Sequence, residues 1–144
     1  MNRYLVITPA KDEEKYLPSL IDSLVNQSVT PERWIIIDDG SRDASPRIID
    51  QAAQRYPWIE PHHLAPRLRR EEGGESVIMQ FLPRQTWEQY DYIFRLDAEH
   101  PAFTRAALQN FIPAPVSARS AGSKTGRAGT PATKLAPCVA MVLL

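Results

Sequence analysis

Apolar and polar segments alternate along the first half of the chain in a way that predicts strands and helices in turn. A short apolar, β-branched run at residues 4–8, stopped by Pro9, predicts a strand buried on both faces. A helix is predicted next, because apolar residues recur at helical spacing and Pro18 falls in its first turn. Those residues are Leu17, Leu20, Ile21, Leu24 and Val25. A second buried strand is predicted at residues 34–37.

The same order then repeats. Ser45 and Pro46 offer an N-cap followed by proline at the first helical position, and apolar residues as far as Tyr56 line one helical face. Residues 58–64 predict a third, shorter strand, which Pro61 confines to a sheet edge or a ragged end.

Further along, the pattern is weaker until one more clear strand. Two glycines at 73–74 precede a predicted helix from about Glu75, which Pro83 breaks or kinks. Residues 92–96 form the next apolar run. Alternating strands and helices imply an α/β fold with a mainly parallel sheet and right-handed crossovers.

Composition changes abruptly after Phe111. Of the last 33 residues, 20 are Ala, Gly, Ser, Thr or Pro, and none is aromatic. We therefore expect one folded domain over residues 1–111 and a low-complexity, disordered tail over residues 112–144. The final apolar run from Cys138 is too short to change that expectation.

Charge and cysteine content narrow the class of protein. The 17 basic and 17 acidic residues cancel, so no net charge draws the chain to nucleic acid or an anionic membrane. The single cysteine, Cys138, excludes an internal disulfide and a multi-cysteine metal site. No apolar run approaches the roughly 20 residues of a membrane helix, and the N-terminus does not resemble a signal peptide. We expect a cytoplasmic protein, soluble or peripheral to a membrane.

Three of the predicted strands end in polar motifs, at residues 8–13, 38–41 and 97–99. The carboxyl ends of parallel strands meet at one sheet edge, where loops and helix N-termini converge on ligands. In order and spacing, residues 7–17, 34–43 and 94–99 resemble the N-terminal, donor-binding part of a family-2 glycosyltransferase with the glycosyltransferase A fold.

This resemblance covers about residues 3–111. It implies a Rossmann-like, three-layer αβα fold. It also implies transfer of a sugar, usually with inversion, from a nucleotide-diphosphate sugar to the hydroxyl of a glycan or lipid-linked glycan.

The resemblance places Asp39 on the nucleotide base, since it matches the second acid of the family's Asp-Asp-Gly-Ser motif. A carboxylate there accepts a hydrogen bond from a ring N–H, while Asp38 anchors the loop. The alternative is a plain turn, which these residue types favour. The other wall of the pocket would be formed by four residues, Thr8, Pro9, Ala10 and Glu13. They would contribute backbone contacts, and Glu13 would also contribute its side chain.

The segment after Ala10 departs from the family pattern. The family often has an aromatic residue and then asparagine, whereas this chain has Lys11 and Asp12, which weakens the case for base stacking. The alternative is that Asp12, Glu13 and Glu14 complement the dipole at the N-terminus of the first helix. For Glu14 and Lys15, a solvated helix face is the expectation.

Asp97 and Glu99 correspond to the family's Asp-x-Asp element, whose acids hold Mg²⁺ or Mn²⁺ against the donor diphosphate. Glu99 is one methylene longer than the family's second acid, which makes coordination through water an alternative. The other interpretation is two acids at an exposed strand end. For His100, a surface residue is the expectation, and a further metal ligand is the alternative.

Arg70 is our candidate for contacting the diphosphate, because arginine pairs bidentately with phosphate. It lies in an Arg-rich loop before the 73–74 glycines, and a solvated charged loop is an equal alternative. The neighbouring acids cancel the basic patch, so nucleic-acid binding is not expected.

No Asp or Glu follows Glu99, so no candidate catalytic base is found there. The change after Phe111 therefore suggests a truncated or frame-shifted reading frame that lacks the acceptor half. The alternative function is a non-catalytic nucleotide-sugar-binding module that works with a partner. A dinucleotide-dependent oxidoreductase is disfavoured, because no Gly-x-Gly-x-x-Gly follows the first strand.

Overall fold

The protein is a parallel α/β structure in which each early strand is followed by a helix. A computed structural model of the 144-residue chain describes residues 3–66, 81, 89–99 and 141–143. In chain order the elements are β1 (Tyr4–Ala10), α1 (Leu17–Val25), β2 (Arg33–Asp38), α2 (Ser45–Arg55), β3 (Ile59–His63), β4 (Tyr92–Arg95) and β5 (Met141–Leu143). The predicted order of strands and helices is confirmed over this part of the chain.

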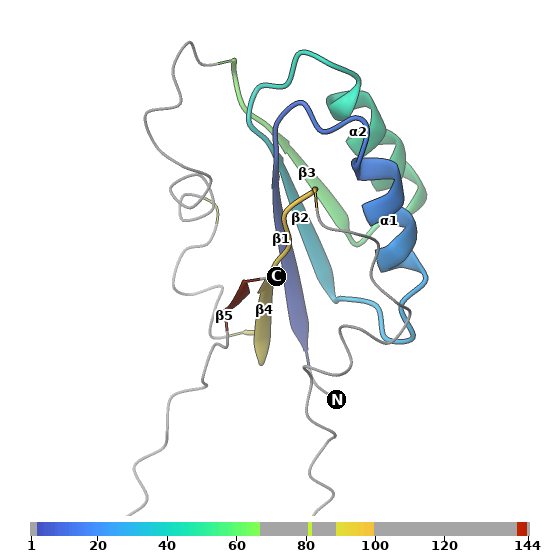
Figure 1. The fold of residues 1–144 in the computed structure, drawn as a ribbon. Coiled ribbons are helices and arrows are strands. Elements are labelled where there is room, and N and C mark those ends of the chain that lie inside the picture. The colour runs from blue at the N-terminus through green and yellow to red at the C-terminus, as the bar shows by residue number, and fades with distance from the viewer. Residues whose placement is uncertain (1–2, 67–80, 82–88, 100–140, 144) are drawn as a thin grey trace, which may run out of the picture.

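The five strands form one sheet in the order β3-β2-β1-β4-β5, and every neighbouring pair is parallel. β1 lies at the centre, while α1 and α2 both lie on one face of the sheet (Figure 1). β3 is an edge strand, as Pro61 predicted, because its ladder has β2 on one side only. The Rossmann-like α/β class predicted from the sequence is thus the class observed.

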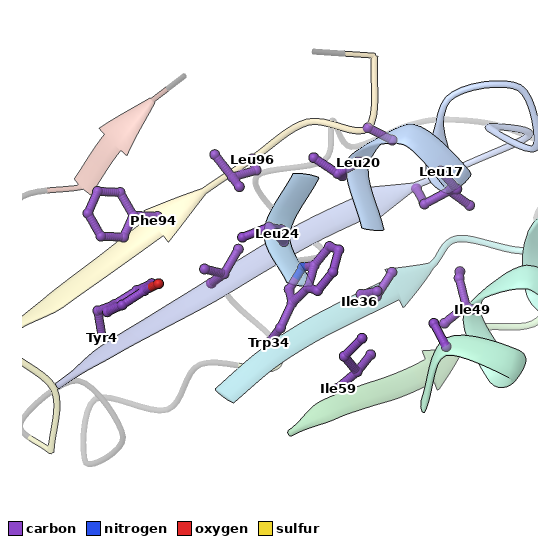
Figure 2. Close-up of a cluster of buried hydrophobic side chains, with 14 residues drawn as sticks. Tyr4, Leu17, Leu20, Leu24, Trp34, Ile36, Ile49, Ile59, Phe94 and Leu96 are labelled. Carbon is purple, nitrogen blue, oxygen red and sulfur yellow. The ribbon is translucent and has the colours of Figure 1, made fainter. Parts of the chain in front are cut away.

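Both faces of the central strands are buried. On the helix side, Trp34 and Ile36 of β2 pack under the α1 leucines (Figure 2). On the opposite side, Leu5 and Ile7 of β1 pack with Ile35 and Ile37 of β2, covered in part by Tyr90, Leu64 and Phe81. Alternation of side chains along a strand sends apolar residues to both faces, and each fully buried one contributes about 1.5–3 kcal/mol.

Pro9 does not end the first strand, contrary to prediction. β1 continues to Ala10, which lies opposite Asp38 of β2. Backbone groups alternate in direction along a strand. The Ile7 carbonyl points toward β4, and the Ala10 carbonyl points toward the end of β2. The amide that proline lacks would therefore point toward β4, where the pairing ends at Ile7 opposite Arg95. Proline thus ends the pairing with β4 at this position and leaves the pairing with β2 intact as far as Ala10.

The second helix begins differently from the prediction. Ser45 is its first residue rather than its N-cap, and the N-cap position is Ala44, whose side chain cannot cap. Asp43 takes over the capping role, because its Oδ1 accepts the Ser45 N–H at 2.8 Å. The Ser45 hydroxyl is thereby available for another partner, the backbone of the β1 loop.

Several predictions fall on parts of the chain that the structure does not describe. The helix predicted from about Glu75 is one, apart from Phe81, which is helical. The predicted disorder of residues 112–140 is a second prediction that lies outside the described residues. Within the final apolar run, Met141–Leu143 form β5 beside β4. Among the described helices, none is long and apolar enough to span a bilayer.

Candidate functional site

The carboxyl ends of β1, β2 and β4 meet at one edge of the sheet. On one side of β1, the Asp39 N–H donates a hydrogen bond to the Ala10 carbonyl at 2.9 Å. On the other side, the Leu96 N–H donates to the Ile7 carbonyl at 3.0 Å, so Asp97 leaves β4 next to β1. The edge therefore places the β2 turn and the acids after β4 on either side of the end of β1.

Asp38 anchors the turn that carries Asp39, as predicted. It is buried, and its Oδ1 accepts the Ser41 N–H at 2.9 Å. Its Oδ2 lies 3.1 Å from Nδ1 of His63, and its carbonyl accepts the Leu64 N–H at 2.8 Å. These bonds tie the turn to the neighbouring strand β3.

Gly40 allows the turn to pass close to another part of the backbone. Its φ of +70° belongs to the left-handed region, which L-residues with a Cβ adopt at a cost. A Cβ at this position would lie 2.6 Å from the Cα of Pro66. Glycine is thus required both for the turn's conformation and for its contact with the segment after β3.

Asp39 is half-buried, with its Oδ1 shielded from solvent. Its backbone carbonyl accepts a hydrogen bond from the Lys11 ammonium at 2.8 Å. Lys11 departs from the family pattern in sequence, and in the structure its side chain links the β1 loop to the β2 turn. We did not anticipate this role, because the partner is a backbone carbonyl 28 residues away.

The loop after β1 and the turn after β2 exchange further hydrogen bonds. Asp12, at φ +54°, donates its N–H to the Ser41 hydroxyl at 2.9 Å. Its carboxylate accepts the Arg42 N–H at 2.7 Å. The Glu13 N–H donates to the Ser45 hydroxyl at 2.8 Å. The two loops therefore form one hydrogen-bonded unit, in which polar backbone groups near the helix N-termini are satisfied.

Glu14 is exposed, as predicted, but it also makes two hydrogen bonds that the sequence did not indicate. Its Oε2 accepts the Ala44 N–H, and its own N–H donates to Oδ2 of Asp43, each at 2.9 Å. Partial burial acts to raise the pKa of Asp43, but hydrogen bonds from Ser45 and Glu14 outweigh it, so the pKa lies below its ordinary value. An acid two residues before Ser45-Pro46 is the sequence signal that could have identified Asp43 as a cap.

Thr8 lies inside the structure rather than on the edge. It is fully buried, and its hydroxyl accepts a hydrogen bond from the Trp34 indole N–H at 3.0 Å. Ala10 is also buried, whereas Pro9 and Glu13 are partly exposed. Of the four residues predicted for this wall, Pro9 and Glu13 are thus the ones with side-chain surface facing outward.

Asp97 and Glu99 are exposed at the end of β4 and are separated by the buried Ala98. Nε of Arg95 lies 3.3 Å from Oδ1 of Asp97. Within the described ranges, no group of three His, Cys, Asp or Glu side chains is arranged to hold a metal. Two hard oxygen donors still suit a divalent cation that takes its other ligands from a diphosphate. Arg70 and His100 lie outside the described residues.

The parallel sheet, the helices on its face and the polar edge formed by β1, β2 and β4 define a Rossmann-like fold of the glycosyltransferase type. The profile of Glycosyl transferase family 2 matches residues 5–98, and the chain belongs to this family. The resemblance noted in the sequence is confirmed.

Among curated relatives, the undecaprenyl-phosphate 4-deoxy-4-formamido-L-arabinose transferase of Proteus mirabilis is 34% identical over 83 residues. The match covers 55% of this chain and 24% of that protein. This chain therefore spans about a quarter of the length of such relatives.

Two solved structures share the fold. Residues 1–349 of S. aureus TarS, crystallised with UDP-GlcNAc, superpose with a TM-score of 0.59 at 18% identity, covering 76% of this chain and 30% of that one. The mannosyltransferase PcManGT from Pyrobaculum calidifontis, in complex with GDP-Man and Mn²⁺, also gives 0.59 at 18% identity, covering 77% and 31%. At these identities the likeness shows the fold alone.

Proposed function

We propose that this chain carries the donor half of a glycosyltransferase. A nucleotide-diphosphate sugar would bind at the carboxyl edge of β1, β2 and β4. The acceptor oxygen would form a bond to the anomeric carbon as the bond from that carbon to the diphosphate breaks, with inversion. The nucleoside diphosphate departs, and a base takes the acceptor proton; we assign that base to no residue of this chain.

The observation that carries the proposal is the position of Asp39. Asp38 and Gly40 hold it at the end of the central strand pair, beside Ala10. A carboxylate at this place can accept the ring N–H of a base such as uracil or guanine. Pro9 and Glu13 would line the other wall with backbone from Thr8 and Ala10, and Arg70 would contact the diphosphate.

Asp97 and Glu99 are the residues that would hold a divalent cation. Mn²⁺ or Mg²⁺ bound there would neutralise charge on the departing diphosphate. Support comes from the exposure of both carboxylates at the same edge as Asp39, and from PcManGT, whose structure contains Mn²⁺ with GDP-Man. The acceptor we propose is a glycan or a lipid-linked glycan, in line with the undecaprenyl-phosphate named in the Proteus relative.

A thermal-shift series on the full chain tests the proposal. UDP-, GDP- and TDP-sugars are added with and without Mn²⁺, and ATP serves as a control polyanion. A ligand at one hundred times its Kd adds about 2.7 kcal/mol to the free energy of unfolding. We expect metal-dependent stabilisation by one nucleotide-sugar class; stabilisation by none of them, or equally by ATP, would refute the proposal.

The second candidate is donor binding without transfer, in a module that acts with a partner. Its support is that every residue to which we assign a role in this chain acts on the donor or on the cation. Turnover of the stabilising donor with an added acceptor decides between the two. General-base assistance is worth about 10²–10⁴-fold, so a chain that binds the donor without a base should transfer at a correspondingly low rate.

A further inference from the structure

His63 lies between two carboxylates at the end of the edge strand β3. Its Nδ1 is 3.1 Å from Oδ2 of Asp38, and its Nε2 is 3.0 Å from Oδ1 of Asp50 on α2. Asp38 is the buried anchor of the turn that carries Asp39, whereas Asp50 is exposed. The imidazole thus connects β2, β3 and α2, and one of its two partners is the residue that anchors the turn carrying Asp39.

Two carboxylates can each accept a hydrogen bond from this ring only when both ring nitrogens carry protons. A neutral imidazole has one N–H, so one of the two contacts must lose its hydrogen bond on deprotonation. Partial burial acts to lower the pKa of His63, but hydrogen bonds to Asp50 and Asp38 outweigh it and hold the pKa above its ordinary value. Among described residues, the charged groups that act on His63 are these two acids.

We propose that His63 is a positioning residue for the nucleotide: as an imidazolium between Asp50 and Asp38, it holds the 38–41 turn in the shape that presents Asp39 to the base. The proposal rests on the proposed donor-binding function. It adds a residue outside the three edge motifs, and it makes the shape of the turn depend on the protonation of that residue.

The sign of the pH dependence follows from the direction of the shift. A group whose pKa is raised on folding stabilises its contacts at low pH and loses that contribution as pH rises through the raised value. The turn should therefore be held most firmly below the ordinary histidine pKa of about 6.5 and loosen above the raised one. Nucleotide affinity should fall over the same interval.

An NMR titration of the full chain tests the positioning role without any nucleotide. The reporter is the backbone amide of Ser41, which donates to Asp38 Oδ1. We expect it to shift with the same midpoint as the His63 ring, and we expect that titration to be absent in His63→Gln. In Asp50→Asn, an exposed substitution that should not disturb folding, the midpoint should be lower. A Ser41 amide that does not follow His63, or that titrates unchanged in His63→Gln, would overturn the proposal.

His62→Gln is the matched control. His62 is the preceding residue on the same strand. Its Nε2 lies 2.7 Å from Oε1 of Glu60 and its ring packs against the Phe81 ring, so it does not contact the turn. This variant should leave the Ser41 titration as in the native chain. A lost titration in both variants would mean that any change on β3 disturbs the turn, and would also overturn the proposal.

A calorimetric titration of UDP and GDP across the same pH range tests the link to the ligand. The native chain should lose roughly fivefold in affinity as His63 deprotonates, a coupling at the low end of the usual range. His63→Gln should bind weakly at every pH. If the native chain binds and His63→Gln shows the same dependence of affinity on pH, the proposal is overturned. Failure of the native chain to bind at any pH would refute the donor-binding function instead, and the NMR titration would still report on the turn.

Discussion

The Lys11 ammonium donates a hydrogen bond to the backbone carbonyl of Asp39, at 2.8 Å. Lys11 belongs to the loop after β1 and Asp39 to the turn after β2, so one side chain bridges the two loops that frame the proposed base pocket. A charged donor makes a stronger hydrogen bond than a neutral one. The side chain that stands where the family often has an aromatic residue thus connects two loops by a hydrogen bond.

Replacing Lys11 by methionine should weaken this connection. Methionine keeps most of the apolar stem but removes the donor, so we expect the free energy of unfolding to fall by about 1 kcal/mol. Urea denaturation followed by circular dichroism measures the change. Lys15→Met is the control, because Lys15 is exposed and its ammonium lies over the neighbouring Tyr16 ring instead of bonding to the turn after β2. Equal effects of the two substitutions would contradict the bridging role.

Substituting Gly40 by alanine should destabilise the protein by about 3 kcal/mol, because the positive φ and the contact with Pro66 both oppose a Cβ. Gly40→Asn separates the two causes. Asparagine tolerates positive φ better than alanine, yet its Cβ meets the same backbone atoms. If the contact dominates, the two variants should have unfolding free energies within about 1 kcal/mol of each other. A loss of less than about 1 kcal/mol in Gly40→Ala would show that the turn relaxes freely.

Asp39→Asn and Asp97→Asn should have different effects on nucleotide binding. Asp39→Asn places an amide where an acceptor oxygen faces the base, which should cost about 1–3 kcal/mol with or without Mn²⁺. Asp97→Asn should reduce affinity mainly when Mn²⁺ is present, because the lost contribution is mediated by the metal. Calorimetric titration of UDP and GDP into each variant, with and without Mn²⁺, measures both. Equal losses under both conditions would contradict separate roles for the two acids.

Asp43→Asn should destabilise the protein at neutral pH but not in acid. The Asp43 carboxylate accepts N–H groups from Glu14 and Ser45, and its pKa is held low despite partial burial. A depressed pKa contributes stability above the ordinary value of about 3.9 and loses it as pH falls through the lower, folded value. We expect a deficit of about 1 kcal/mol at pH 7 that shrinks toward zero as pH falls through the lowered pKa of Asp43.

Urea denaturation at pH 7 and in acid measures the Asp43 effect. Asp22→Asn is the matched control, since Asp22 is an exposed acid on α1 that accepts a side-chain hydrogen bond from Asn26. It should change the unfolding free energy little at either pH. An Asp43→Asn deficit that persists unchanged in acid would show that the carboxylate's charge does not matter.

Much of the polar sheet edge that forms the candidate site could be predicted from sequence, because its motifs are local. Residues 38–41 combine an acid, a glycine and a serine directly after an apolar run, which indicates a turn at a strand end whatever the rest of the chain does. The parallel order then brings that turn to the same edge as Asp97 and the end of β1. The role of Asp38 as an anchor was predicted together with the resemblance of this motif, and its hydrogen bond from the Ser41 N–H confirms it.

The partners of individual side chains could not be predicted in the same way. Glu14 bonds to the Ala44 amide, 30 residues away, and His63 reaches Asp38, 25 residues away. These choices depend on which backbone groups the sheet and helices bring within about 3 Å, and no local pattern encodes that separation. The start of α2 is a similar case, because Asp43 rather than Ser45 caps it once the Ser45 hydroxyl bonds to Glu13.

The sequence by itself determined the alternation of strands and helices, the parallel sheet and the edge at which its polar motifs gather. Those features follow from hydrophobic periodicity and turn chemistry, which act over a few residues. Only the tertiary structure decided that Thr8 bonds to Trp34 inside the core, that Gly40 must be glycine because of Pro66, and that His63 lies between two carboxylates. Each of these is a contact between distant segments, and its geometry exists only once the sheet has brought those segments together.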